Sequence, residues 1–271
     1  MLEKDIMGFG IAGNFAHHLE QAGESADFVD VEVDEAHAPK GIFPTFIPNS
    51  DSFLGCFPFS DEKIAAIDDK NIQMEPEVGL LCDVSYEGEK IATLTPTHFM
   101  AYNDCSIRVE GAKKISHKKN WGENTKGVSA QAIMIDKFCE GGVMDGYSLS
   151  SFIKRNNEVI QYGENSTLLG YSYFYEKLQK WMIDKLNTQK DVGPLEDLKS
   201  LITKAKQPSK LLISIGATRY TEFGEKHYLQ KRDILYVIVY PHEKFTHDEV
   251  TMMIEEERFS TDLSLLRQEV V

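Results

Sequence analysis

Short apolar runs separated by turns dominate the pattern of hydrophobic and polar positions along the chain. The run EVGLLCDV, the turn YEGEK and the run KIATL predict an antiparallel hairpin that begins after about residue 72. Further strands are predicted at SAQAIMI, at SLSSFIKRNNEVIQ with a turn at NNE, at KLLISI and at DILYVIVY. Strands therefore follow one another directly, instead of alternating with helices as in a βαβ fold.

Three helices interrupt the strands. Apolar residues recur every three or four positions over residues 168–186, which predicts a helix of about five turns, and again over residues 195–205, before Pro208. Thr246 and Glu249 have the spacing of a capping box ahead of a charged helix that extends through Arg258. We therefore expect an α+β fold that is predominantly β, with a few peripheral helices.

The N-terminal part is marked by glycine and proline. GFGIAG at residues 8–13 predicts a tight turn, followed by a short helix that Asn14 caps and Gly23 ends. Residues 36–59 have no helical period and predict a long, partly buried loop.

The same glycines form the pattern G-x-G-x-x-G, which leaves a dinucleotide site as an alternative. Asp30 or Glu32 would then be the carboxylate that binds the ribose. Only seven residues precede Gly8, and a Pro-rich segment follows Val33 where a second helix and strand should begin. We therefore favour the turn.

Charge excludes two classes of partner. Among 271 residues, 29 Lys and Arg face 43 Asp and Glu, a net charge of −14, which disfavours a nucleic-acid groove or an anionic membrane surface. No apolar run reaches the roughly 18 residues of a membrane span, and the first residues do not resemble a signal peptide, so we expect a cytoplasmic protein. The four scattered cysteines are expected to be reduced.

Three acidic residues stand out from this surplus. Glu75 and Glu77 flank Pro76 just before an apolar strand, and at this spacing both side chains leave the same face of an extended chain. Asp104 follows another extended stretch. Three carboxylates without a histidine or thiolate are hard oxygen ligands, which suit Mg²⁺, Mn²⁺ or Ca²⁺. By themselves, in so acidic a chain, they are more typical of a solvated strand edge than of a metal site.

Four short motifs in order resemble the fumarylacetoacetate hydrolase superfamily. They are N-F-A-x-H at residues 14–18, E-P-E-V-G-L-L at 75–81, N-D-C-S-I-R at 103–108 and N-N-E-V-I-Q at 156–161. The segment LLISIGATRYTEFGEKHYLQKRDILYVIV is also similar to the closing segment of those proteins. The resemblance extends from about residue 8 to residue 240.

This resemblance implies a rolled, mixed β-sheet core and a homodimer. It further implies an enzyme that acts on a small 2-oxo or 1,3-dicarbonyl acid. The expected metal is Mg²⁺ or Mn²⁺, and Ca²⁺ is a further candidate. It also implies a set of site residues. Glu75, Glu77 and Asp104 fall on the metal-ligand positions, His18 on that of the general base, Lys119 (or Lys118) on that of a lysine facing the substrate, and Arg108, Gln161, Gly216 and Thr218 on substrate-binding positions.

The chain departs from the family pattern in ways that leave the reaction open. The glutamate that partners the histidine in hydrolytic members is Gln21 here, and Gln cannot take up a proton. These departures favour decarboxylation or keto-enol isomerisation over C–C bond hydrolysis. They also leave a non-catalytic binding protein on the same fold as the alternative.

Three segments are predicted from this pattern. Residues 1–70 carry the His18 helix and the long loop, and residues 71–241 form the metal-binding β-roll, with a helical insertion near 188–208. Residues 242–271 form a C-terminal helical extension.

Overall fold

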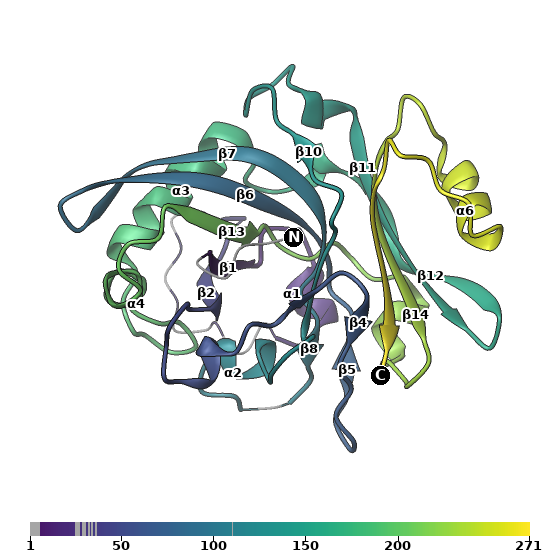
Figure 1. The fold of residues 1–271 in the computed structure, drawn as a ribbon, viewed down its shortest axis with the longest axis horizontal. Helices are drawn as coiled ribbons and strands as arrows, with labels where there is room; N and C mark the ends of the chain where they lie inside the picture. Colours follow the sequence, from purple (N-terminus) through teal and green to yellow (C-terminus); the bar gives the residue numbers. More distant parts are fainter. Residues whose placement is uncertain are drawn as a thin grey trace.

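The computed structural model describes residues 6–24, 28, 31, 33, 35, 37–109 and 111–271. Its largest element is a curled, mixed sheet with the strand order β2-β1-β13-β6-β7-β9-β3 and β10 paired to β7 (Figure 1). These strands are β1 (Met7–Ala12), β2 (Gly41–Phe46), β3 (Phe59–Ser60), β6 (Pro76–Glu87), β7 (Lys90–Asn103), β9 (Lys126–Val128), β10 (Ile133–Met134) and β13 (Lys210–Ser214).

A second sheet, with the order β12-β11-β14-β15-β4, stands beside the first (Figure 1). Its strands are β4 (Lys63–Ile64), β11 (Tyr147–Arg155), β12 (Glu158–Thr167), β14 (Ile234–Pro241) and β15 (Ser264–Val270). The short strands β5 (Ile72–Gln73) and β8 (Ser106–Ile107) pair with each other. The predicted α+β, predominantly β architecture of a rolled mixed sheet is therefore confirmed.

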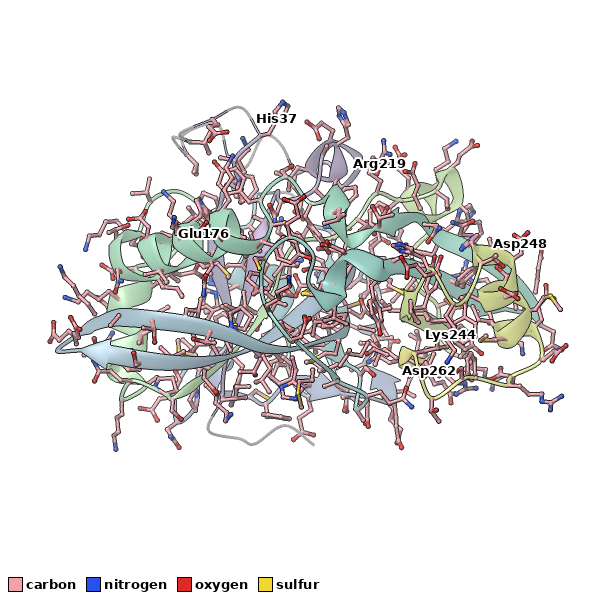
Figure 2. The ribbon with its side chains drawn as sticks, turned by 90° about the horizontal axis from the view of Figure 1, so that it is seen from above. His37, Glu176, Arg219, Lys244, Asp248 and Asp262 are labelled. Atoms are coloured by element: carbon pink, nitrogen blue, oxygen red, sulfur yellow. The ribbon has the colours of Figure 1, made fainter. Side chains whose placement is uncertain are left out.

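Two helices, α3 and α6, pack on the sheets. The apolar side of α3 packs on the long hairpin β6–β7, and that of α6 on the second sheet. Charged residues such as Glu176 on α3 and Asp248 on α6 point away from the sheets (Figure 2). The helices are α1 (His18–Gln21), α2 (Ser116–Lys119), α3 (Tyr175–Thr188), α4 (Leu198–Lys204), α5 (Glu222–Lys226) and α6 (His247–Glu255), with short 3₁₀ turns η2 (Phe53–Gly55), η3 (Val143–Gly146) and η4 (Leu168–Gly170).

Several predicted elements are confirmed. The hairpin of EVGLLCDV and KIATL is β6–β7, and NNE is the turn of β11–β12. The capping box of Thr246 and Glu249 opens α6. Within the described chain, no helix combines the length and apolar character that crossing a membrane requires. The four cysteines are free thiols.

The prediction of a turn at residues 8–13 is wrong, because residues 7–12 form the buried strand β1. Gly10 is needed there because a Cβ would lie 2.4 Å from the ring of Phe43 on the neighbouring strand. Only Gly13, at φ +74°, has the left-handed backbone that a turn after the strand requires. With Gly8 and Gly10 inside a strand, the dinucleotide motif is not formed; Asp30 and Glu32 lie outside the described residues.

Two further boundaries differ from the prediction because tertiary contacts override local pattern. Asn14 does not cap α1, since its amide donates to the carbonyl oxygens of Tyr173 and Ile215, at 3.0 and 2.9 Å. The helix expected over residues 168–186 begins only at Tyr175, because Tyr171 is held upstream by a hydrogen bond from its hydroxyl to the Gly216 carbonyl, 2.9 Å.

Two long segments contain strands that the pattern did not predict. The loop expected over residues 36–59 includes β2, which pairs with β1, and the helical extension expected over residues 242–271 ends in β15. Burial patterns explain both. β2 is buried throughout and therefore shows no alternation, and the buried face of β15 includes the polar residues Ser264 and Gln268, so its sequence lacks the alternation of apolar and polar residues. The division of the chain into three segments stays a prediction.

Candidate active site

The open end of the β6–β7 hairpin brings the three predicted acids together. Pro76 pairs with Asn103 in the antiparallel ladder, so Glu75 and Asp104, the residues just beyond this pair, lie opposite each other. The amide of Asp104 donates to the carbonyl oxygen of Glu75 at 2.9 Å. One carboxylate oxygen each of Glu75, Glu77 and Asp104 lies within 4.8 Å of the others, and all three side chains are buried.

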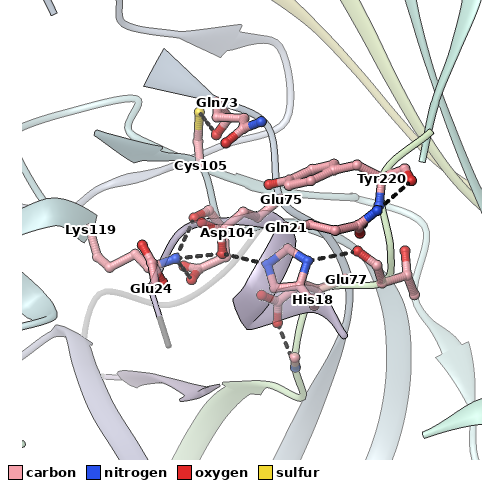
Figure 3. Close-up of polar contacts among 12 residues, drawn as sticks. His18, Gln21, Glu24, Gln73, Glu75, Glu77, Asp104, Cys105, Lys119 and Tyr220 are labelled. Carbon is pink, nitrogen blue, oxygen red and sulfur yellow. Dashed lines mark hydrogen bonds and ion pairs between the residues drawn. The ribbon is translucent and has the colours of Figure 1, made fainter. Parts of the chain in front are cut away.

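Three cations surround this acidic triad of Glu75, Glu77 and Asp104. The ammonium of Lys119 lies 2.6 Å from Glu75 Oε2 and 2.6 Å from Asp104 Oδ2 (Figure 3). Arg108 reaches Glu75 Oε1 at 2.8 Å, and Lys126 reaches Asp104 Oδ1 at 3.5 Å. Lys119 thus lies at the triad, and its role toward a substrate stays a prediction.

The electrostatic surroundings of the three carboxyls differ. Burial alone would raise the pKa of Glu75, but the charges of Lys119 and Arg108 outweigh it and hold this pKa well below its usual range. Burial raises the pKa of Glu77 well above its usual value, and the charge of Asp104 raises it further. Burial also raises the pKa of Asp104, against the effect of Lys119. Burial lowers the pKa of Lys119, yet Asp104 and Glu75 outweigh it and keep the ammonium charged.

His18 faces the triad from α1 with a defined tautomer. Its Nδ1 lies 2.9 Å from the carbonyl oxygen of Thr218, and because a carbonyl only accepts hydrogen bonds, Nδ1 carries the proton. Its Nε2 is then an acceptor, which lies 4.0 Å from Glu75 Oε2 and has no hydrogen-bond partner among the described residues. Burial lowers the pKa of His18, which keeps the ring neutral.

Gly216 and Thr218 reach the site through their backbones. The amide of Gly216 donates to Glu77 Oε2 at 2.8 Å, and this residue has φ +110°, a conformation that favours glycine. The amide of Thr218 donates to the Pro76 carbonyl oxygen at 3.2 Å, while its own carbonyl orients His18. These predicted substrate-binding positions therefore support the site through peptide groups.

Gln21 and Glu24 show what α1 supplies in place of the missing acid. Gln21 binds the backbone of Tyr220, accepting from its amide at 2.9 Å and donating to its carbonyl at 3.2 Å. Glu24 is a buried acid that the sequence motifs do not include, and its Oε1 accepts from Arg108 at 2.6 Å and from Lys118 at 2.9 Å. Its position directly after Gly23, the predicted end of the helix, was the only sequence signal for it; α1 itself ends at Gln21.

Two predicted residues lie away from the triad. Gln161 is on β12, where its side-chain amide donates to the Gly163 carbonyl at 3.0 Å, and it lines neither of the two spaces described next. Lys118 approaches Glu24 instead of the triad. Lys126, by contrast, was missed, although it is fully buried beside Asp104.

A small cavity and a larger cleft meet at this site. The cavity, of about 20 Å³, is bordered by Glu75, Glu77, Lys119 and His18, and has room for one particle the size of a water molecule. The cleft, of about 780 Å³, is lined by Gln73, Arg108 and Lys118 among others. Glu24 borders both spaces.

The donor set fits a hard divalent cation. All three carboxylates are oxygen ligands, and Glu77, although 2% exposed, has no ion pair among the described residues and one hydrogen bond, from Gly216. A buried carboxylate without a cation is costly unless it takes up a proton or binds one. The triad therefore has the chemistry of a site for Mg²⁺, Mn²⁺ or Ca²⁺.

Comparisons with known proteins agree with this fold. Residues 24–270 match the model of a family described as "Family of unknown function (DUF5718)". No curated protein is similar in sequence.

Three solved structures are similar over nearly the whole chain. One is 2-keto-3-deoxy-D-arabinonate dehydratase complexed with magnesium and 2,5-dioxopentanoate, with 16% identity, a TM-score of 0.54 and coverage of 97% of this chain and 72% of that one. An HpcE-type protein from Mycobacterium smegmatis has 13% identity, a TM-score of 0.56 and coverage of 99% and 76%. A protein from Yersinia pestis assigned to the fumarylacetoacetate hydrolase family has 10% identity, a TM-score of 0.52 and coverage of 100% and 96%. The resemblance to that superfamily is thus confirmed for the fold.

Proposed function

Because the chain belongs to the DUF5718 family, a family of unknown function, we propose its activity from the site itself: a divalent-metal-dependent enzyme that acts on a small 2-oxo or 1,3-dicarbonyl acid. The observation that carries this proposal is the convergence of three buried carboxylates within 4.8 Å, next to a cleft whose lining includes Arg108 and Lys118. The fold shared with a dehydratase bound to magnesium and an oxo acid supports it.

Glu75, Glu77 and Asp104 would hold the ion, with Mg²⁺ or Mn²⁺ as the expected metals and Ca²⁺ as a further candidate. A bound divalent cation supplies Lewis acidity, which polarises a carbonyl group and stabilises the enolate that forms when an adjacent bond breaks. The amide of Gly216 fixes the orientation of Glu77.

The substrate would enter through the cleft. Arg108 and Lys118 line it and are suited to bind a carboxylate, Arg108 with a planar guanidinium that Gln73 holds in place at 2.6 Å. Lys119 adds positive charge where negative charge would develop. His18 Nε2 is the group placed to take a proton, because the Thr218 carbonyl holds the proton on the other nitrogen.

The surroundings of His18 favour proton transfer over water activation. Its orienting group is a neutral carbonyl, and Gln21 is occupied with the backbone of Tyr220. A His without a carboxylate partner is a weaker base for activating water. We therefore place decarboxylation, keto-enol isomerisation and dehydration ahead of C–C bond hydrolysis, dehydration being the reaction of one structural neighbour.

The experiment combines metal binding with turnover. Mn²⁺ should raise the melting temperature of the wild type but not of Asp104→Ala, and the Mn²⁺-loaded protein should consume oxaloacetate, an acylpyruvate or a 2-oxo-3-deoxy acid. Metal binding without turnover across this panel would favour the alternative, a non-catalytic binding protein on the same fold. No binding at millimolar Mn²⁺ would overturn the metal site. Homodimer formation stays a prediction, to be measured by sedimentation.

A further inference from the structure

Lys119 has an unusual position for a lysine beside a candidate metal site. Its ammonium does not approach the triad from outside but lies between two of its members, 2.6 Å from Glu75 Oε2 and 2.6 Å from Asp104 Oδ2. It also donates to the Asp104 carbonyl oxygen at 3.2 Å, and its side chain is 3% exposed. Among the described polar groups, the ammonium contacts only these two residues.

The ammonium occupies space that a coordinated ion would need. Oxygen ligands lie about 2.0–2.1 Å from Mg²⁺ and about 2.3–2.6 Å from Ca²⁺, so an ion bound to the same two oxygens would overlap Nζ. The remaining cavity of about 20 Å³ borders Lys119 directly, so an ion placed there would lie beside the ammonium. Like charges in a buried site repel strongly, because little solvent screens them.

Charge balance points the same way. The three carboxylates of the triad already face three cations, Lys119, Lys126 and Arg108. Adding a divalent ion to this set would leave two uncompensated positive charges in a buried site, whereas releasing one lysine halves the excess.

Lys119 is the cation that can leave. Lys126 is also bound to the Cys105 carbonyl, and Arg108 to Gln73 and Tyr220, so both are anchored outside the triad. Glu24 offers the displaced ammonium an acceptor, because it borders both cavity and cleft and lies beside Lys119 (Figure 3).

Building on the proposed metal site, we propose that Lys119 is a built-in counter-cation. Its ammonium and the divalent ion bind the same carboxylates in turn, and ion binding releases Lys119 toward Glu24 and the cleft. The lysine would thus stabilise the metal-free site and would face the substrate only once the metal is bound.

Mn²⁺ affinity, measured by calorimetry and by electron paramagnetic resonance without substrate, tests this exchange. Lys119→Met, which removes the competing charge, should bind Mn²⁺ at least about tenfold more tightly than the wild type. Lys114→Met is the control, a lysine five positions earlier whose ammonium binds Asp191 at 2.8 Å, and should bind Mn²⁺ within about twofold of the wild type. Lys119→Gln keeps a hydrogen-bond donor between the carboxylates and serves if Lys119→Met does not fold.

The outcomes separate the two proposals. Equal or weaker Mn²⁺ binding by the Lys119 variants than by the wild type would overturn the exchange and leave the metal site intact. Binding by the Lys119 variants alone would overturn the exchange, because the wild-type ammonium would then never give way to the ion, and would also remove the proposed metal dependence of the wild-type protein. No binding by any variant at millimolar Mn²⁺ would overturn both.

Discussion

Two clusters of buried charge, one on each sheet, are built on opposite principles. On the second sheet, Arg155 of β11 binds Asp233 with two parallel hydrogen bonds, at 2.8 and 2.6 Å, and the Gln230 amide donates to the same carboxylate at 2.6 Å. One cation meets one anion, and each oxygen of Asp233 accepts a hydrogen bond. This is the geometry of a pair that serves the fold.

The triad on the first sheet crowds three carboxylates together instead. Neither oxygen of Asp104 has a hydrogen bond of good geometry among the described residues, although Lys119 and Lys126 lie beside them. Glu77 has no cation in contact there, and its pKa is raised. Like charges held this close cost stability unless a ligand compensates them, so the contrast distinguishes a structural ion pair from a binding site.

The largest expected effect comes from removing one acid from each cluster. Asp104→Asn should weaken Mn²⁺ binding at least about 100-fold, because a neutral amide replaces a charged ligand, and should abolish turnover. Asp233→Asn should bind Mn²⁺ like the wild type while losing about 2 kcal/mol of unfolding free energy. Calorimetry and urea unfolding measure the two quantities. The comparison fails if both variants lose metal binding equally.

The next largest effect is on the free energy of unfolding, when one cation is removed from each cluster. Without metal, Lys119→Met should lower the free energy of unfolding by about 3 kcal/mol, because it leaves Glu75 and Asp104 less compensated in a buried site. Arg155→Met should cost about 1–2 kcal/mol, since Arg155 is more exposed to solvent. Added Mn²⁺ should restore the first variant only. Rescue of both, or of neither, in urea unfolding would contradict the contrast.

His18 tests whether the triad supports chemistry as well as binding. His18→Asn should lower kcat about 100-fold and leave Mn²⁺ affinity within about twofold, because the ring holds a proton acceptor beside the site. His17→Asn is the matched control: His17 is exposed, and its φ of 66° is one that Asn tolerates well. A variant at position 18 that kept full activity would remove His18 from the mechanism.

The smallest effect concerns a third kind of buried carboxyl, paired with a neutral group. Glu196 accepts from the Ser116 hydroxyl at 2.5 Å, and burial raises its pKa to about 7. The folded state therefore holds this proton more tightly than the unfolded state, and stability should fall as the pH rises from about 4.5 to about 7. In Glu196→Gln, the decrease in the free energy of unfolding over this pH range should be smaller by on the order of 2 kcal/mol.

Urea unfolding at pH 5 and pH 8 measures the change, with Glu20→Gln on the surface as the control. An unchanged pH dependence in Glu196→Gln would show that Glu196 titrates normally. Glu196 would then behave as a solvated carboxyl, unlike the buried carboxyls of the triad.

Local pattern was enough for the hairpins, and together with the family resemblance it was enough for the triad. In β6–β7, apolar runs flank a polar turn, and the antiparallel register that follows places Glu75 opposite Asp104. The spacing of Glu75 and Glu77 then determines that they share a face. These features depend on neighbours in sequence or on one strand pairing.

The rest depends on contacts between distant segments, which no local pattern contains. β1 was mistaken for a turn because its glycines serve close packing against Phe43. Glu24 and Lys126 lack a motif, and they join the site only when α1 and β9 come against the hairpin. Gln161 matched a motif, yet its side chain turns back to its own strand.

The ring of His18 and the Thr218 carbonyl that orients it lie 200 positions apart in the chain. Asn14 bridges a similar separation to Ile215, and β1 pairs in parallel with β13 just before both contacts in the chain. Closing so long a loop is slow and comes late in folding. The proton acceptor should therefore reach the acids only after the hairpin has formed, and folding intermediates should lack activity. A proteolytic cut that releases the segment carrying β13 should therefore abolish activity before the β6–β7 hairpin unfolds.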